Sequence, residues 1–336
     1  MKLVTYLKDE HEQLAVLINN MVYDMDVLHP DLPNSMNMFL SYWEDIFPTA
    51  QAGELMLREG TRSSKKGLPI DSVQLIAPVP FPPSCRDAYS FRQHVSTARR
   101  NRKAEMIPEF DQYPVFYFTN HHSIQGPGEV RCMPDHFEDL DFELEAAIVI
   151  SKHGRNIQAE EADEYIAGLM IMNDLSARKL QREEMLLNLG PAKGKDFATA
   201  IGPWLVTLDE LQLFEVATKE NHTGKNWNLT MKCSVNGVKV SEGKLSDMDW
   251  TFAEIIERAS YGVDLYPGDI IGSGTVGTGC FLELNGTARL NDPNYTEQWL
   301  QAGDIVEMEI DGLGKLSNTI VAEENTWSIL KRKKGV

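Results

Sequence analysis

The chain has 336 residues, 42% of them hydrophobic, with a formal net charge of −18 at pH 7 and a sequence pI of about 4.9. This length allows one large domain, or a small domain followed by a large one. The acidic balance argues against binding to a nucleic-acid backbone, which needs a basic surface, and no apolar stretch approaches the length of a transmembrane helix.

The ends of the chain and its cysteines favour a cytoplasmic protein. Met1–Leu7 is apolar only briefly before charged residues follow, so we expect no signal peptide. The basic run Lys331–Lys334 is typical of a solvated tail rather than a nucleic-acid site. No two cysteines form a CxxC pair, which predicts free thiols and neither a thiolate zinc site nor a disulfide framework.

The first part of the chain predicts a small N-terminal β/α domain over residues 1–75. Lys2–Leu7 and Leu14–Ile18 are expected strands, and the region Met36–Glu59 is an expected helix. The proline-dense segment Ala77–Pro83 is incompatible with a helix and predicts an extended entry into a catalytic domain over residues 76–330.

The second part predicts a β-rich α+β domain with a few helices. Ala146–Ile150 is an apolar run typical of a buried strand, and Met231–Val240 and Gly303–Ile310 are expected strands bounded by turn residues. Helical spacing of apolar residues predicts helices over Ala159–Asn173 and Phe252–Ser260.

Two glutamates, Glu143 and Glu145, directly precede the apolar run at Ala146–Ile150. In a strand, side chains two residues apart point to the same face, so the two carboxylates should stand side by side. Like charges at such a distance repel, and burial removes their hydration. A divalent cation is one economical way to compensate both costs.

Other polar residues have ordinary interpretations when each is taken alone. Asp87 is typical of a turn, and Asp174 is either a helix N-cap or a ligand. His94 is typical of a satisfied or surface histidine. Glu283 lies between two leucines on a segment that resembles a strand with an exposed carboxylate.

Taken together, several ordered motifs resemble the fumarylacetoacetate hydrolase family, from about Ile76 to the C-terminal strands. Their order and spacing favour the fumarylacetoacetate-cleaving members of bacterial type, which have a short N-terminal region. The motifs are Asp87 with Tyr89–His94, Glu143–Glu145, Asn173–Arg178, Leu189–Phe197 and Ser273–Thr275.

The resemblance implies a mixed β-roll catalytic domain, a homodimer and a hard-cation centre. Asp87, Glu143, Glu145 and Asp174 would bind Mg²⁺ or Ca²⁺ through carboxylate oxygens, and the sequence does not choose between these ions. Lys195 and Thr199 match positions around a second, structural Mg²⁺ in some members.

The resemblance also implies hydrolysis of a carbon–carbon bond in a β-diketone acid, with fumarylacetoacetate giving fumarate and acetoacetate in the last step of tyrosine and phenylalanine catabolism. His94 matches the general base and Glu283 the carboxylate that orients it. Lys195, Arg178 and Gln181 match residues that stabilise the oxyanion and hold the diketone.

Expected substrate contacts are Tyr89, Tyr117, Thr275 and an arginine shortly after the base. We select Arg100, although Arg99 and Arg102 are close rivals. A substrate-contacting tyrosine expected a few residues after Gln181 is absent, and Met185 and Leu186 occupy that stretch.

Two alternatives remain open. Acylpyruvate or fumarylpyruvate hydrolysis, decarboxylation and isomerisation can use a similar metal–enolate centre on the same fold. The more distant alternative is a non-catalytic protein that binds a divalent ion for stability, which would leave the base and the cations without a role.

Overall fold

The computed structural model describes residues 1–62, 66–324 and 327–334. A 12-stranded sheet has the order β4-β3-β2-β1-β15-β13-β11-β21-β6-β7, with β5 beside β1 and β8 beside β15. Its strands are β1 (Lys2–Lys8), β2 (His11–Ile18), β3 (Met21–Asp24), β4 (Leu68–Pro69), β5 (Gln74–Leu75), β6 (Cys85–Ala88), β7 (Phe116–Thr119), β8 (Ile124–Gln125), β11 (Leu144–Ile150), β13 (Ile166–Asp174), β15 (Thr199–Thr207) and β21 (Ile270–Gly272).

A five-stranded sheet of order β19-β18-β22-β23-β9 packs against one face of the large sheet. Its strands are β9 (Gly128–Cys132), β18 (Thr230–Val235), β19 (Val238–Lys244), β22 (Ile305–Ile310) and β23 (Gly314–Ala322). Short pairs complete the strands: β10 (Leu140–Asp141) with β14 (Ser176–Ala177), β12 (Gly154–Arg155) with β20 (Asp264–Leu265), and β16 (Glu215–Val216) with β17 (Asn226–Trp227).

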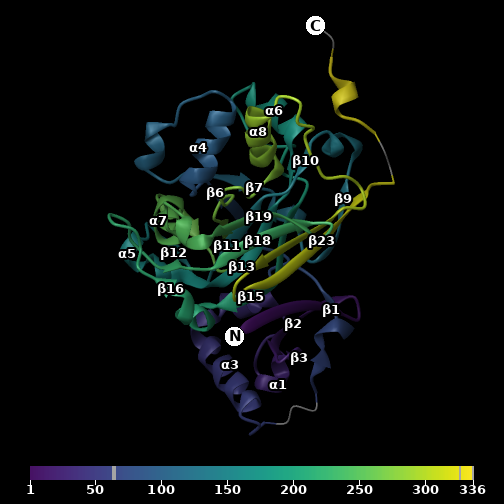
Figure 1. Ribbon diagram of the computed structural model, residues 1–336. Coiled ribbons are helices and arrows are strands. Elements are labelled where there is room, and N and C mark those ends of the chain that lie inside the picture. Colours follow the sequence, from purple (N-terminus) through teal and green to yellow (C-terminus); the bar gives the residue numbers. More distant parts are fainter. Residues whose placement is uncertain (63–65, 325–326, 335–336) are drawn as a thin grey trace.

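Helices cover the outer sides of these sheets. Figure 1 shows the N-terminal helices at one end of the molecule, and α4, α6 and α8 together at the opposite end. The helices are α1 (Met25–Leu28), α2 (Met36–Ser41), α3 (Trp43–Arg58), α4 (Arg92–Asn101), α5 (Ala159–Ala162), α6 (Arg178–Met185), α7 (Phe252–Ser260) and α8 (Phe281–Asn291). This mixed, β-rich arrangement confirms the predicted fold class, and the described strands do not close into a barrel.

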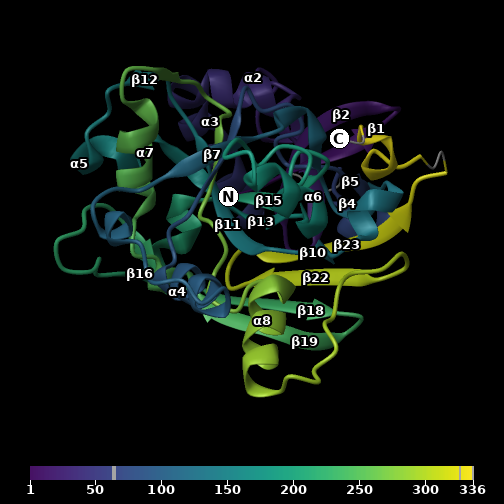
Figure 2. The ribbon, with the colours of Figure 1, turned by 90° about the horizontal axis from the view of Figure 1, so that it is seen from above.

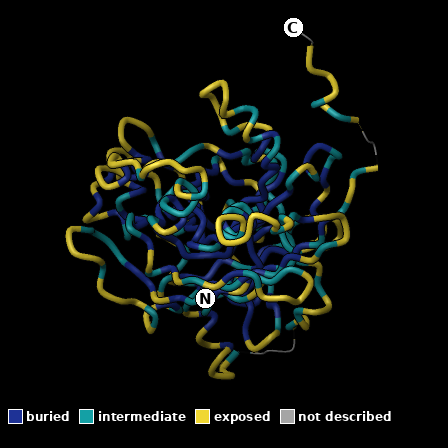
Figure 3. The backbone as a smooth tube through the Cα atoms, turned by 45° about the horizontal axis from the view of Figure 1, so that its top comes forward, coloured by how far each residue is buried: buried dark blue, intermediate teal, exposed yellow. Residues whose placement is uncertain are grey.

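The central strand β11 is buried on both faces and separates two hydrophobic clusters. Ala146 and Ile148 pack in the cluster shared with the five-stranded sheet, whereas Ala147 and Val149 pack with the N-terminal helices. This alternation follows from the two-residue period of a strand. Figure 3 shows that the buried segments of the chain lie in the interior and the exposed segments around the outside.

Most predicted elements are confirmed with small shifts. The expected N-terminal strands correspond to β1 and β2, and the expected helical region divides into α2 and α3. The predicted helix Phe252–Ser260 has the same bounds as α7, because Thr251 and Glu254 form a capping box at its start. The predicted strand Met231–Val240 is instead a hairpin, with Asn236 and Gly237 between β18 and β19.

Two predicted elements are wrong. The expected helix over Ala159–Asn173 ends after α5 and a short 3₁₀ turn, and Ile166–Asp174 forms strand β13. Every residue of β13 is buried, so apolar residues occupy both faces and the two-residue period disappears from the sequence. Glu283 lies in helix α8 rather than in a strand, and only 2% of it is exposed.

The N-terminal strands continue the large sheet. Leu3 of β1 pairs with Leu205 of β15, and the cluster around Leu3 includes residues of β11 and β13. The division into domains at residues 75 and 76 stays a prediction. Within the described residues, no helix is long and apolar enough to cross a membrane.

The burial of Leu3 gives a test of this continuity. Leu3 is 0% exposed and Leu7, on the same strand, is 37% exposed. Leu3→Ala should lower the free energy of unfolding by about 2–5 kcal/mol, because it leaves a cavity between the N-terminal helices and the sheet. Leu7→Ala should cost about 1 kcal/mol or less in the same chemical denaturation experiment. Equal losses would contradict this packing.

Candidate active site

Four buried carboxylates meet where strands of the large sheet end. Asp87 lies on β6, Glu143 and Glu145 at the start of β11, and Asp174 at the end of β13. One ligand oxygen from each lies within 4.8 Å of the others. Glu143 precedes the first residue of β11, so the pair spans the strand's start rather than its interior.

The sheet register explains why these residues share one face. Glu145 continues the alternation of Ala147 and Val149, so it points to the side of the N-terminal helices. Between β11 and β6, Gly272 pairs with both Ala147 and Asp87. A Cβ at Gly272 would lie 2.5 Å from Asp87 Oδ1, so this glycine leaves the space that the Asp87 carboxylate occupies.

The electrostatics of the cluster fit a divalent cation. Burial and the charge of Asp174 raise the pKa of Asp87 to about 8. Burial and the charge of Asp87 raise the pKa of Glu145 well above its usual range. Glu145 Oε2 and Asp174 Oδ1 are buried without a hydrogen-bond partner. Oxygen donors of this kind suit a hard ion such as Mg²⁺ or Ca²⁺.

Two buried cations lie against the same carboxylates. Lys195 Nζ donates to Glu143 Oε2 at 2.6 Å and also to Asp174. Arg178 Nη2 donates to Glu143 Oε1 at 2.6 Å. Burial alone would raise the pKa of Glu143, but the charges of Lys195 and Arg178 outweigh it and lower that pKa. Glu143 is therefore the ionised anchor of the cluster.

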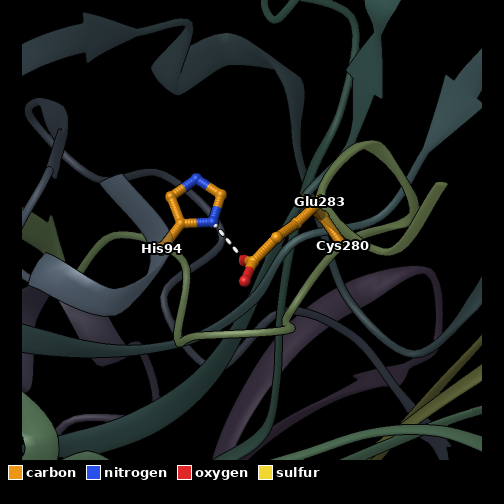
Figure 4. A group of neighbouring side chains, drawn as sticks. All are labelled: His94, Cys280 and Glu283. Carbon is orange, nitrogen blue, oxygen red and sulfur yellow. Dashed lines mark hydrogen bonds and ion pairs between the residues drawn. The ribbon is translucent and has the colours of Figure 1, made fainter. Parts of the chain in front are cut away.

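A second buried group pairs a histidine with a carboxylate. His94 Nδ1 and Glu283 Oε2 are 2.8 Å apart, and Figure 4 shows the imidazole facing the carboxylate with Cys280 close by. The Thr278 N–H donates to the same Glu283 oxygen at 2.9 Å. With Nδ1 held by Glu283, Nε2 is the nitrogen left to act on a substrate or water. The charge of His94 also lowers the pKa of Glu143, so the two groups are electrostatically coupled.

Other residues singled out from the sequence surround these groups. Tyr117 donates to Asp174 Oδ2 at 2.6 Å, and Thr275 donates to Glu145 Oε1 at 3.3 Å. Gln181 accepts from Arg178 Nη1 at 3.0 Å. Further contacts are Tyr89 edge-to-face against His94, with ring centroids 5.8 Å apart, and Thr199 Oγ1, 3.4 Å from Thr119 Oγ1.

Arg100 does not lie among these residues. Its side chain is exposed, and Nη2 donates to Thr287 of α8 at 3.1 Å. Burial raises the pKa of Tyr89, and the positive charge of Arg102 opposes that rise. Among the rival arginines, Arg102 is thus the one whose charge acts on a residue of the site.

Asp141 was not singled out from the sequence. Its carboxylate is fully buried and accepts from Arg178 Nε at 2.9 Å. The signal was present, because Asp141, Glu143 and Glu145 occupy alternate positions of one segment. The family motifs account for the two glutamates alone, so they do not point to Asp141.

Comparison with known proteins gives a family model that matches most of the chain and several relatives of similar length. Residues 84–321 match the family model described as fumarylacetoacetate (FAA) hydrolase C-terminal. The chain is 26% identical to a fumarylacetoacetate hydrolase domain-containing protein 2 homolog of Dictyostelium discoideum, over 95% of this chain and 97% of that protein.

Relatives with different activities are similar to it at the same level. The fumarylacetoacetase of Oryza sativa subsp. japonica is 29% identical over 81% of this chain and 76% of its own length. The mitochondrial oxaloacetate tautomerase Fahd2a of Rattus norvegicus is 29% identical over 94% of this chain and 89% of its own length. The similarity therefore does not single out fumarylacetoacetase.

Solved structures share the fold. A maleylpyruvate hydrolase from Sphingobium sp. SYK-6, in complex with manganese(II) and pyruvate, gives a TM-score of 0.68 at 20% identity, covering 96% of this chain and 100% of that one. A 5-carboxymethyl-2-hydroxymuconate delta-isomerase from Mycobacterium smegmatis gives 0.65 at 21% identity, with the same coverage. At these identities the likeness establishes the fold alone. Because the family model covers more than half of its residues, the chain belongs to the fumarylacetoacetate hydrolase family.

Proposed function

We propose that this protein is a metal-dependent hydrolase that cleaves a carbon–carbon bond in a β-diketone acid, with fumarylacetoacetate as the first substrate to test. The observation that carries the proposal is the buried His94–Glu283 pair next to a buried cluster of four carboxylates. A histidine oriented by a carboxylate can activate water as a general base, and a cluster of carboxylates can bind a divalent cation.

Asp87, Glu143, Glu145 and Asp174 would hold the ion, which we propose to be Mg²⁺ or Ca²⁺. When bound, the ion supplies Lewis-acid polarisation of a 1,3-dicarbonyl and a counter-charge for the enolate product. Manganese in the maleylpyruvate hydrolase structure supports divalent-ion use on this fold. Lys195 and Thr199 remain proposed neighbours of a second, structural Mg²⁺.

His94 would act as the base through Nε2. It takes a proton from water as the water oxygen attacks the substrate carbonyl carbon, and Glu283 stabilises the imidazolium that forms. Breaking the carbon–carbon bond leaves its electron pair on the departing enolate. His94 then returns the proton to that carbon, so one water is consumed and the base is restored.

The remaining side chains would bind and orient the substrate. Lys195 and Arg178 bring positive charge to the carbonyl oxygen where negative charge develops. For the substrate carboxylate we propose an arginine at the end of α4, either Arg100 or Arg102. The other proposed contacts are Tyr89, Tyr117, Gln181 and Thr275.

A second candidate is oxaloacetate tautomerisation, which the similarity to the rat tautomerase favours. It needs the same cation and a base, but no hydrolytic water. A panel of fumarylacetoacetate, acylpyruvates, fumarylpyruvate and oxaloacetate, assayed for cleavage, decarboxylation and keto–enol exchange, separates these reactions. A homodimer in the cytoplasm remains our expectation, which light scattering and cell fractionation can test.

Replacing the proposed base should remove turnover and spare the cation site. His94→Ala should lower kcat by about 100-fold or more, because general-base catalysis contributes at least that much. Mg²⁺ affinity, measured by calorimetry, should stay within about threefold of the wild type, since His94 is not one of the four carboxylate ligands. The control His153→Ala changes an exposed histidine that contacts Asp264 and should keep full activity. Full activity of His94→Ala would contradict the assignment.

Removing one ligand charge should weaken the cation site. Glu143→Gln keeps the size of the side chain but loses the charge that faces Lys195 and Arg178. Mg²⁺ affinity should fall by about 10-fold or more, and activity should return in part at high Mg²⁺ concentration. Glu129→Gln, on the exposed part of β9, is the matched control. Unchanged affinity in Glu143→Gln would exclude it as a ligand.

At pH values below the pKa of Asp87, metal binding should release a proton from the Asp87 carboxyl. Because that pKa is raised to about 8, the carboxyl is protonated in the metal-free protein at lower pH, and the ion needs the ionised form. Apparent Mg²⁺ affinity should therefore rise as the pH increases from about 6 to about 8. Calorimetry in buffers of different ionisation enthalpy counts the protons released, and Asp87→Asn should lower that count without removing the share that comes from Glu145. Affinity independent of pH would contradict this coupling.

A further inference from the structure

The catalytic scheme leaves one fully buried carboxylate in the site without a role. Asp141 is 0% exposed and lies on β10, where it pairs with Ser176 of β14. Its Oδ1 accepts from the N–H groups of Phe142 at 2.9 Å and Phe281 at 2.7 Å. Its Oδ2 accepts from the Leu282 N–H and from Arg178 Nε, both at 2.9 Å. All these contacts are donors, so they fit the ionised carboxylate.

One side of Asp141 holds the start of helix α8. The N-cap residue of this helix, Cys280, makes no side-chain capping bond. The first N–H groups of a helix need acceptors, and Asp141 supplies them to Phe281 and Leu282 from a distant part of the chain. Glu283 follows directly on the same turn, so its position relative to His94 depends on this anchor.

The other side of Asp141 holds Arg178. The guanidinium donates through Nε to Asp141 Oδ2, and its Nη2 lies 2.8 Å from the same oxygen and donates to Glu143 Oε1. A planar guanidinium held at two nitrogens presents its donors in a fixed direction. Asp141 therefore fixes the cation that orients one carboxylate of the four-carboxylate cluster.

We propose that Asp141 is a positioning residue that sets the metal-ligand side and the base side of the site relative to each other. The inference rests on the proposed function for the roles of His94 and Glu143. It goes beyond that function because Asp141 itself contacts neither the proposed base nor the four carboxylates through its side chain; it acts through Arg178 and through the first turn of α8.

Asp141→Asn tests the proposal with a side chain of the same size. The amide keeps one acceptor oxygen, but its NH₂ group then faces the Leu282 N–H and the Arg178 guanidinium, which are also donors. We expect Mg²⁺ affinity and kcat to fall together, each by about 10- to 100-fold, as for other residues that hold metal ligands. By contrast, His94→Ala should lower kcat and keep Mg²⁺ affinity. Glu143→Gln should lower Mg²⁺ affinity, with activity returning in part at high Mg²⁺ concentration.

A matched control separates positioning from helix capping as such. Asp135 is 5% exposed, and its Oδ2 accepts from the N–H groups of Ile329 and Leu330 at the start of a 3₁₀ turn (Leu330–Arg332). Asp135→Asn removes the same charge from a buried capping carboxylate and should leave both Mg²⁺ affinity and kcat unchanged. Equal functional losses in both variants would overturn the proposal.

A double-mutant cycle with Glu283→Gln tests the route through α8. If Asp141 acts by placing Glu283, the fold-loss in kcat from Asp141→Asn should shrink several-fold in the Glu283→Gln background. The two losses would multiply if Asp141 acted independently of Glu283, and that result would overturn this route.

Two further measurements keep the outcome decisive. Should Asp141→Asn fail to fold, Asp141→Ser removes the charge and leaves a hydroxyl that can turn its oxygen toward the neighbouring donors, and it should show the same joint loss. Should the wild type cleave no β-diketone acid, the proposed function fails, while Mg²⁺ titration of Asp141→Asn and Asp135→Asn still tests Asp141. Wild-type Mg²⁺ affinity in folded Asp141→Asn would overturn the proposal in either case.

Discussion

The rest of the site depends on one constraint: four carboxylates share a buried space less than 5 Å across. At such distances each pair of like charges costs about 4 kcal/mol at the effective dielectric typical of proteins. Two features of the site reduce this electrostatic cost. Lys195 and Arg178 neutralise Glu143, and the raised pKa values of Asp87 and Glu145 keep protons on the others until a cation replaces them.

The sheet makes this concentration of charge compatible with folding. Each acid lies at or next to the end of a strand that contributes apolar side chains to the two hydrophobic clusters, so the strands are held by their hydrophobic parts. The four carboxylates, which are the proposed ligands, come from β6, β13 and the start of β11, and their relative positions follow from the register of these strands. His94, the proposed base, lies on a separate element, helix α4, and its partner Glu283 lies on α8. The two groups therefore need a link, and Asp141 lies where such a link is required.

Sequence reasoning succeeded where local signals decide structure. The capping box at Thr251 and Glu254 sets the start of α7. The order of the motifs also predicted that residues far apart in the chain belong to one site. It failed where the deciding contact is distant. Strand β13 has no two-residue period because both of its faces are buried, and α8 begins where Asp141, not a local cap, accepts its first N–H groups. The spacing that selects Arg100 does not show the direction of its side chain, which donates to Thr287, and its role as a substrate contact stays a prediction.

The four carboxylates favour the binding of a divalent cation, and the His94–Glu283 pair favours proton transfer. Hydrolysis and tautomerisation, however, both need a cation and a base. The difference must lie in what the site admits beside the reacting carbonyl. Two regions could set this difference: Tyr89, on whose pKa the charge of Arg102 acts, and the exposed end of α6, where Met185 lies in the stretch in which the resemblance leads us to expect a tyrosine. Since neither region contributes to the carboxylate cluster, changes there can alter the substrate without disturbing the charge balance that holds the centre together.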